Sequence, residues 1–265
     1  MSNNERYDKI GIGYDSTRKA DPYLAQRMYD LIHSGKANSL YLDVGCGTGN
    51  YTSALNAKGL RFIGIEPSEE MLDKARVKNE TITWKKGYAE SLDLASESVD
   101  GVLVSLTIHH WKDLNKGFQE IARVLKKDGK VVLFTTLPEQ TKAYWLYHYF
   151  PKMIEDSIKI LPKLEVVKAA FSKAGLKLVE QEPYFVKPDL EDWFLYCGKH
   201  DPERYFNEDI RKGISSFSLI AHQKEVEKGL QKLRADIDNG TIKNVMKEYE
   251  NDMGDYLFLV GKTHK

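Results

Sequence analysis

The hydrophobic and polar positions along this chain predict strands and helices in alternation. Short apolar runs rich in branched side chains are typical of buried strands, and the segments between them have helical spacing. Because strands that alternate with helices form parallel sheets, we expect an α/β fold with a doubly wound sheet. The apolar runs that we interpret as strands lie at residues 40–44, 62–65, 82–84, 100–106, 131–136, 176–186 and 256–260.

A glycine-rich turn follows the first apolar run. Asp43 stands near the end of that run, and Gly45, Gly47 and Gly49 follow at alternate positions, with Cys46 among them. Glycine adopts backbone angles that other residues avoid and has no side chain to block a ligand. A strand, a glycine turn and a helix bring a ligand against backbone N–H groups at the start of the helix. We interpret Cys46 as a packing residue.

A second acidic residue, Glu66, ends the second apolar run. It lies about 20 residues beyond the turn, where a carboxylate can accept hydrogen bonds from both ribose hydroxyls of an adenosine. The alternative is that Glu66 caps the helix that begins near Ser68, although Pro67 and Ser68 supply helix-start signals of their own.

The glycine spacing distinguishes between nucleotide ligands. A dinucleotide turn has G-x-G-x-x-G and a P-loop has a lysine, whereas this turn has G-x-G-x-G and no lysine. Asp43 and the three glycines resemble the first motif of class I S-adenosylmethionine-dependent methyltransferases, in the small-molecule branch with ubiquinone-biosynthesis-like and trans-aconitate-like enzymes. The resemblance covers roughly residues 7–137 and resumes more weakly to the C-terminus.

The resemblance implies a Rossmann-like sheet of seven strands, mostly parallel, with the last strand antiparallel between the fifth and the sixth. It also implies the cofactor S-adenosyl-L-methionine and methyl transfer by in-line displacement. Tyr14 and Arg18 match a leader that folds over the cofactor, where Arg18 could pair with the methionine carboxylate. Surface or packing roles stay open for both.

Further cofactor contacts also follow from the resemblance. It places Met71 beside the adenine or ribose, although a methionine there can equally pack in the core. It places Ala89 and Glu90 at the adenine edge, where Tyr88 departs from the family pattern. The implied contacts after the glycine turn also include Pro67, Ser105 and Leu106.

Two adjacent histidines follow the fourth apolar run. Ligands of open α/β sheets lie beyond the carboxyl ends of the strands, so a reactive group would project there. His109 and His110 stand in a Leu-x-x-His-His-Trp segment that resembles the pocket lining of related methyltransferases. We expect His109 or His110 to be a pocket residue, and these two are the candidate catalytic residues. The alternative is that they are only polar residues at a helix start.

Two segments depart from the alternating pattern. Residues 138–165 are rich in aromatic side chains, and residues 187–255 make the last connection far longer than a hairpin needs. We interpret both as a helical cap over the active-site edge of one domain, 1–265, with a helical leader at 1–35. The aromatic rings can form the core of the cap or a lid over an acceptor.

The second cap segment is expected to be mostly helical over residues 189–247. Its polar and aromatic side chains include candidates to face an acceptor. These are Asp192, Trp193, His200, Arg204 and Tyr205.

The composition of the chain limits the kinds of binding partner that we expect. Lys+Arg and Asp+Glu are both 39, so no basic excess favours a nucleic acid, and we expect a small-molecule acceptor. Two cysteines make neither a disulfide framework nor a metal site. We see no signal-peptide-like run and no membrane-spanning run, and therefore expect a cytoplasmic protein without a membrane partner. The oligomeric state stays open.

Two alternative interpretations assign the chain to other function classes. A nicotinamide dehydrogenase is disfavoured by the glycine spacing and by the lack of a catalytic Tyr-x-x-x-Lys. A catalytically silent sensor or interaction protein that binds S-adenosylmethionine or S-adenosylhomocysteine is the alternative that stays open, and product formation distinguishes it from an enzyme.

Overall fold

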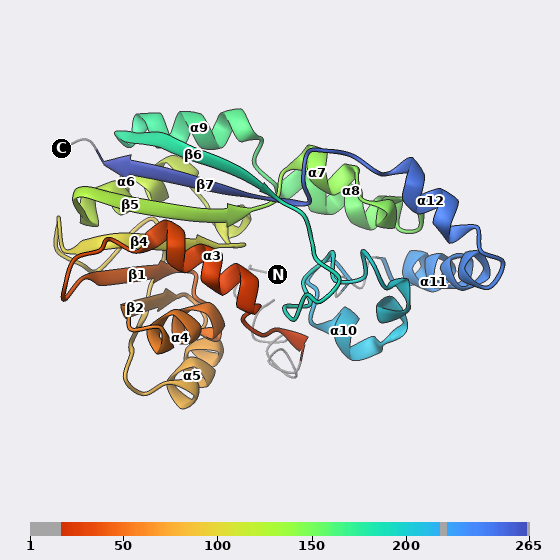
Figure 1. The fold of residues 1–265 in the computed structure, drawn as a ribbon, viewed down its shortest axis with the longest axis horizontal. Coiled ribbons are helices and arrows are strands. Elements are labelled where there is room, and N and C mark those ends of the chain that lie inside the picture. The colour runs from red at the N-terminus through yellow and green to blue at the C-terminus, as the bar shows by residue number, and fades with distance from the viewer. Residues whose placement is uncertain (1–16, 218–221, 264–265) are drawn as a thin grey trace.

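A seven-stranded sheet forms the centre of the molecule, in the order β3-β2-β1-β4-β5-β7-β6 (Figure 1). The structure is a computed structural model that describes residues 17–217 and 222–263. All strand pairs are parallel except those of β7 with β5 and β6. The strands are β1 (Leu40–Val44), β2 (Arg61–Glu66), β3 (Thr83–Lys86), β4 (Val99–Ser105), β5 (Leu125–Thr135), β6 (Leu176–Tyr184) and β7 (Tyr256–Thr263).

This topology confirms the expected fold class, including the antiparallel last strand between the fifth and the sixth. The fifth strand begins earlier than the apolar run suggested, and Asp128 within it has a positive φ of 62°. Polar residues at 126–130 hid this extension: Leu125 pairs with Val99, and the ladder is irregular before Lys130 pairs with Gly101.

Helices cover both faces of the sheet, which makes it doubly wound. On the β5 strand, Val131 and Leu133 pack with α6 and α9, while Val132 and Phe134 pack in the core that α3 and α4 share. This alternation is the two-residue period of a strand buried on both faces. The helices beside the sheet are α3 (Pro22–Ile32), α4 (Asn50–Ala57), α5 (Glu69–Lys78), α6 (Leu114–Val124) and α9 (Leu164–Lys173).

Helix starts follow the local sequence signals. The Asp21 carboxylate accepts from the Leu24 N–H at 2.9 Å, and Pro22 occupies the first turn of α3. Ser68 caps α5, where its side chain accepts from the Met71 N–H. Both residues stabilise backbone donors that have no partner inside the helix.

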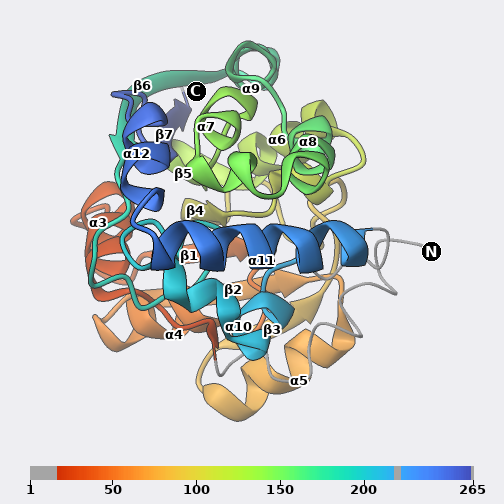
Figure 2. The same ribbon diagram turned by 90° about the vertical axis from the view of Figure 1, so that its right-hand side faces the viewer.

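Residues 138–160, 189–217 and 222–248 contain short helices and turns that lie beyond the carboxyl ends of the parallel strands, and we call them the cap (Figures 1 and 2). Residues 189–201 form turns and bends rather than the expected helix. The cap elements are α7 (Pro138–Lys142), η2 (Trp145–His148), α8 (Pro151–Ile160), η3 (Pro202–Phe206), α10 (Glu208–Lys212), α11 (Gln223–Asp238) and α12 (Ile242–Glu248).

The aromatic side chains of the first cap segment form a core. Tyr144, Trp145 and Phe150 are buried, and the Tyr144 ring stacks on Tyr196 with centroids 4.1 Å apart. The hydroxyls of Tyr144 and Tyr205 lie 2.6 Å apart in a buried hydrogen bond. These rings therefore hold the two cap segments together, as the core-packing alternative expected.

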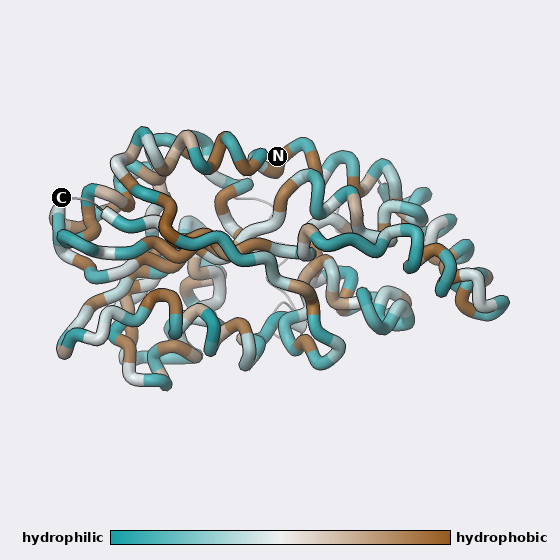
Figure 3. Tube along the Cα trace, turned by 45° about the horizontal axis from the view of Figure 1, so that its top comes forward, coloured by the Kyte–Doolittle hydropathy of each residue, from teal (hydrophilic) through white to brown (hydrophobic). Residues whose placement is uncertain are grey.

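Hydrophobic stretches concentrate in the central strands, and hydrophilic ones lie along the outer helices (Figure 3). Among the helices in the described ranges, none combines the length and the hydropathy that crossing a membrane requires.

Phe134 provides a test of how the sheet joins the cap. Its side chain is fully buried and contacts the rings of Phe194, Tyr256 and Phe258. We expect Phe134→Ala to lower the free energy of unfolding by about 3–5 kcal/mol, because it leaves a cavity between aromatic rings. Chemical denaturation measures this loss. Val179→Ala, on a β6 residue 50% exposed, is the control and should cost less than about 1 kcal/mol; an equal loss in both variants would contradict the prediction.

Candidate functional site

A cavity of about 240 Å³ lies between the carboxyl ends of the strands and the cap. Its sheet side comes from the ends of β1, β2 and β4, and its cap side from α7, α8 and the segment after α10. This is the position in which open α/β sheets bind ligands. Among the residues expected at the site, those that line the cavity are Arg18, Asp43, Gly45, Cys46, Gly47, Glu66, Pro67, Met71, Ser105, Leu106, His109 and His110.

Three expected residues do not line the cavity. Gly49 begins α4 with a φ of 73°, and a Cβ there would lie 2.4 Å from the Trp84 ring, so this glycine serves close packing. Ala89 is buried in the core that α6 contributes to. Glu90 accepts from the Lys112 N–H at 2.6 Å and the Asp113 N–H at 3.2 Å, ahead of α6.

Tyr14 lies outside the described residues, so its expected role has no structural counterpart here. The candidates of the second cap segment that were expected to face an acceptor do not all line the cavity. Asp192 lines the cavity, whereas the buried Tyr205 bonds to Tyr144 and His200 Nε2 lies 2.7 Å from the Val186 carbonyl. Trp193 and Arg204 stack against each other and do not line this cavity.

The glycine turn is shaped by close approach on one side and open space on the other. Gly45 has a φ of 76°, and a Cβ on it would lie 2.3 Å from Thr107 Oγ1. Gly47 has a φ of 55°, and a Cβ on it would meet no atom within 4 Å. The left-handed angles disfavour other residues at both positions. Gly47 therefore leaves backbone exposed to the cavity.

The Glu66 carboxylate joins two turns. Gly47 N–H donates to Oε2 at 3.0 Å and Ser68 N–H donates to Oε1 at 3.1 Å. The side chain is buried, and burial raises its pKa while the two backbone hydrogen bonds oppose that rise. The contact with Ser68 is the helix-start bond that the alternative proposed. The contact with Gly47 fixes the carboxylate in the cavity wall, so both features coexist in one residue.

Asp43 is a buried carboxylate with unused hydrogen-bonding capacity. It is 2% exposed, and Thr52 Oγ1 donates to Oδ2 at 2.6 Å. Oδ1 is buried without a hydrogen-bond partner among the described residues. Burial, with a smaller effect of the Glu66 charge, raises the pKa of Asp43 to about 7, although the Thr52 hydrogen bond lowers it. An orphaned carboxylate oxygen in a cavity wall suits a ligand that carries N–H donors.

The Arg18 side chain forms an ion pair with the cap. Its guanidinium pairs with both oxygens of Asp192, and Tyr51 Oη donates to the same carboxylate at 3.0 Å. Nearby, Trp193 N–H donates to the Thr17 carbonyl at 3.0 Å. These bonds attach the described start of the chain to the turns of the second cap segment. Arg18 lines the cavity as half of an ion pair.

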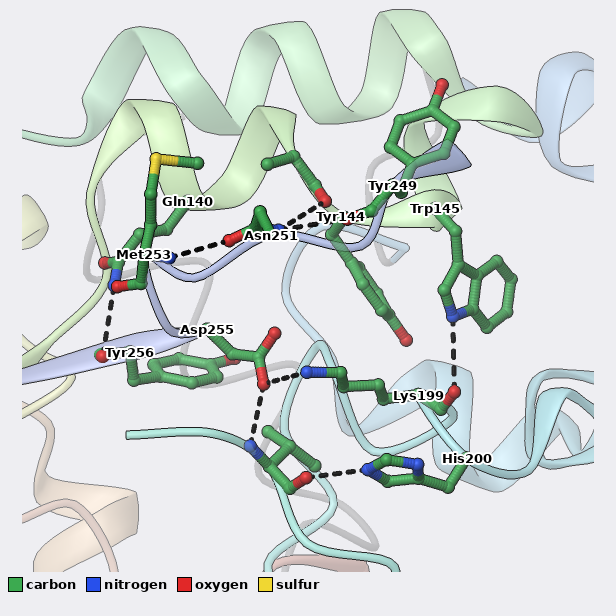
Figure 4. Close-up of polar contacts among 12 residues, drawn as sticks. Gln140, Tyr144, Trp145, Lys199, His200, Tyr249, Asn251, Met253, Asp255 and Tyr256 are labelled. Carbon is green, nitrogen blue, oxygen red and sulfur yellow. Dashed lines mark hydrogen bonds and ion pairs between the residues drawn. The ribbon is translucent and has the colours of Figure 1, made fainter. Parts of the chain in front are cut away.

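A second polar network anchors the cap to β7 (Figure 4). The Asp255 carboxylate accepts from Val186 N–H at 2.7 Å and pairs with Lys199. The Gln140 amide donates to the carbonyls of Met253 and Tyr256, both at 3.1 Å. The network holds the start of β7 in place, and with it the Tyr256 ring that lines the cavity.

The two histidines lie where β4 ends, in η1 (Ile108–His110). Their ring centroids are 3.9 Å apart and both line the cavity. Burial lowers the pKa of His109 to about 4, because the ring is desolvated and no acidic group offsets the loss. His109 is therefore neutral at physiological pH, and its unprotonated ring nitrogen can accept a hydrogen bond.

Sequence reasoning missed the hydroxyl-bearing residues on the cap side. Thr136, Thr141, Ser157 and Ser216 line the cavity, yet they come from the end of β5, α7, α8 and the segment after α10. Only the position of Thr136 at a strand end gave a signal. Within the described residues, no group of His, Cys, Asp and Glu side chains forms a metal site.

Comparisons with known proteins agree with this geometry. A family model described as a methyltransferase domain matches residues 42–133. A solved structure from Anabaena variabilis, described as a "putative methyltransferase from antibiotic biosynthesis pathway", is 37% identical and superposes with a TM-score of 0.81. That superposition covers 92% of this chain and 98% of the Anabaena chain. The chain therefore belongs to the class I S-adenosylmethionine-dependent methyltransferases.

Curated relatives match over shorter stretches. The biotin biosynthesis bifunctional protein BioHC of Cellvibrio japonicus is 31% identical over 145 residues, which is 53% of this chain and 29% of BioHC. The ubiquinone/menaquinone biosynthesis C-methyltransferase UbiE of Rubrivivax gelatinosus is 29% identical over 158 residues, 59% of this chain and 61% of UbiE. The chain thus spans less than two thirds of each of these relatives.

Asp43 gives a pH-dependent prediction. Its folded pKa of about 7 exceeds the usual 3.8, so the folded protein keeps a proton that the unfolded chain loses between about pH 4 and pH 7. Stability from this group is present below pH 4 and falls as the pH rises through that window. Asp43→Asn should flatten this decline, by on the order of 1 kcal/mol per pH unit, in denaturation curves without ligand. Asp93→Asn, at a carboxylate 95% exposed, should follow the wild type; an unchanged slope in Asp43→Asn would contradict the assignment.

Proposed function

We propose that this protein transfers the methyl group of S-adenosyl-L-methionine to a small-molecule acceptor by in-line displacement. The observation that carries the proposal is the meeting of Gly47, Glu66 and Asp43 in one cavity wall. When bound, the cofactor supplies an electron-poor methyl group that a nucleophile displaces from sulfur. Because such a displacement gains most from alignment, the task of the protein is to orient both reactants.

The sheet side of the cavity fits the cofactor. Glu66 would accept hydrogen bonds from the ribose hydroxyls while it keeps its bonds to Gly47 and Ser68. The free Oδ1 of Asp43 would accept from the amino group of the methionine part. Met71 and Leu106 provide apolar contacts for the nucleoside. Ala89, Glu90 and Gly49 do not line the cavity, so we leave them out of this contact set.

Arg18 has a more limited part in this arrangement than the leader pattern implied. Its guanidinium is held by Asp192, so it would reach a methionine carboxylate only while sharing its donors with that residue. We propose that the Arg18–Asp192 pair mainly holds the cap against the cofactor side.

His109 stands on the acceptor side. The neutral imidazole would take a proton from an acceptor that loses one during attack. His110 packs against it, with ring centroids 3.9 Å apart, and would fix its orientation.

The cap supports a small acceptor. It covers the cavity with residues from α7, α8 and the segment after α10, and the chain as a whole has no excess of basic residues. The cytoplasmic location expected from the sequence stays a prediction. A protein that binds the cofactor without turnover remains the second candidate, and the methylated product distinguishes the two.

Cofactor binding is tested by isothermal titration. We expect S-adenosylhomocysteine to bind more tightly than NAD, and Glu66→Ala to weaken its binding by about 10- to 150-fold, as the loss of a hydrogen bond to a charged group predicts. Glu165→Ala, on the exposed start of α9, is the matched control and should bind as the wild type. Tighter binding of NAD would refute the proposed cofactor, and normal binding by Glu66→Ala would refute the ribose contact.

The histidine role is tested by turnover. His109→Gln keeps a neutral polar side chain but removes the basic nitrogen, so we expect normal cofactor affinity and about 100-fold lower kcat. Since the pKa of His109 is about 4, the wild-type rate should show no loss from this group between pH 8 and pH 5. His33→Gln, exposed at the end of α3, is the control. Full activity in His109→Gln would show that the acceptor needs no base here.

A further inference from the structure

The cap side of the cavity has a consistent hydrogen-bond polarity. Ser157 Oγ donates to the Met153 carbonyl at 3.0 Å and lies 2.8 Å from Ser216 Oγ. A hydroxyl has one proton, so Ser157 has none left for Ser216. Ser216 is therefore the donor within that pair. Its proton points at the protein, and its remaining hydrogen-bonding capacity consists of lone pairs.

A second hydroxyl pair repeats this arrangement at the end of β5. Thr136 Oγ1 donates to the Asp255 carbonyl at 3.0 Å and lies 3.3 Å from Thr141 Oγ1. Because the Thr136 hydroxyl proton is already donated to the Asp255 carbonyl, Thr141 is the donor to Thr136. Both pairs line the cavity. A ligand beside these two pairs meets oxygen atoms that accept hydrogen bonds from it rather than donate to it.

The charges of the cavity wall also disfavour an acidic acceptor. Among the lining residues within 17–217 and 222–263, Arg18 is the only lysine or arginine, and it is neutralised by Asp192. The other ionisable acids of the wall are Asp43 and Glu66. Beside the two hydroxyl pairs, the described part of the wall offers an acidic acceptor lone pairs and no unpaired cation, so its charge would lose water without a replacement there.

Besides Ser215 and Asp192, the cap side of the cavity carries apolar side chains. Leu161, Phe194, Leu195 and Ile214 line it beside the hydroxyls. An acceptor with an apolar body gains from burial against these side chains. Its polar substituents are then best placed against Ser216 and Thr136.

We propose that the acceptor is a molecule without acidic groups that carries O–H or N–H donors on an apolar body, bound between the Ser157–Ser216 and Thr136–Thr141 pairs. This inference rests on the proposed methyl transfer and specifies its substrate class. Carboxylates and phosphate esters of the same skeleton are rejected, because they bring acceptor oxygens to a wall of lone pairs.

The experiment separates this inference from the proposed function. A small-molecule extract of the source organism is divided on an anion exchanger at pH 8 into retained and unretained fractions. Each fraction is incubated with the full chain and methyl-labelled S-adenosylmethionine, and labelled products are separated chromatographically. Label in the unretained fraction supports the inference. Label in the retained fraction alone overturns it and leaves the methyltransferase function standing. Absence of label from both fractions, with S-adenosylhomocysteine still bound in titrations, refutes turnover itself and this inference with it.

A variant tests the hydrogen-bond polarity directly. With the acceptor purified from the active fraction, Ser216→Ala should raise its KM by about 3- to 10-fold, as the loss of one neutral hydrogen bond predicts, with kcat and the affinity for S-adenosylhomocysteine within about twofold of the wild type. Ser172→Ala, an exposed serine on α9, should leave all three constants unchanged. An unchanged KM in Ser216→Ala would overturn the assignment of this hydroxyl to the acceptor.

Discussion

The Glu66 carboxylate is the constraint on which the site depends, because it bonds to the backbone of two turns at once. Gly47 N–H and Ser68 N–H both donate to it, so the turn after β1 and the start of α5 are fixed relative to each other by one buried side chain. A buried charge is tolerated only with such partners. The position of the carboxylate in the cavity wall is thus a result of folding, available before any ligand binds.

A second carboxylate close by gives this wall its electrostatic character. Asp43 is too buried to ionise easily, and the charge of Glu66 raises its pKa further. A ligand that brings an ammonium group beside Asp43 favours the ionised form, since an opposite charge lowers the pKa of a carboxyl group. With the proposed contact between Asp43 and the amino group of the cofactor, binding would therefore release a proton from this residue.

The sequence predicted the parts of this site that depend on local order. The glycine turn, Glu66 and the histidines after β4 each follow a strand end within a few residues, so a linear pattern reveals them. The place of the last strand, antiparallel between the fifth and the sixth, came from the family resemblance rather than from periodicity. Ser157 and Ser216, by contrast, are 59 positions apart, and Arg18 and Asp192 are 174 apart. Such pairs depend on how the cap folds back, which no local pattern encodes.

The cap also explains why residues 189–201 are not helical. Their backbone and side chains bond outward to other elements: Trp193 to the Thr17 carbonyl, Asp192 to Arg18, and Lys199 to Asp255. In the interior of a helix the Trp193 N–H would bond to a carbonyl of the same helix, whereas here it bonds to the Thr17 carbonyl. The segment therefore joins residues 17–18, the cap and β7, and it brings Phe194 and Leu195 into the cavity wall. One side of the cavity is thus built by this irregular segment and the opposite side by the regular sheet.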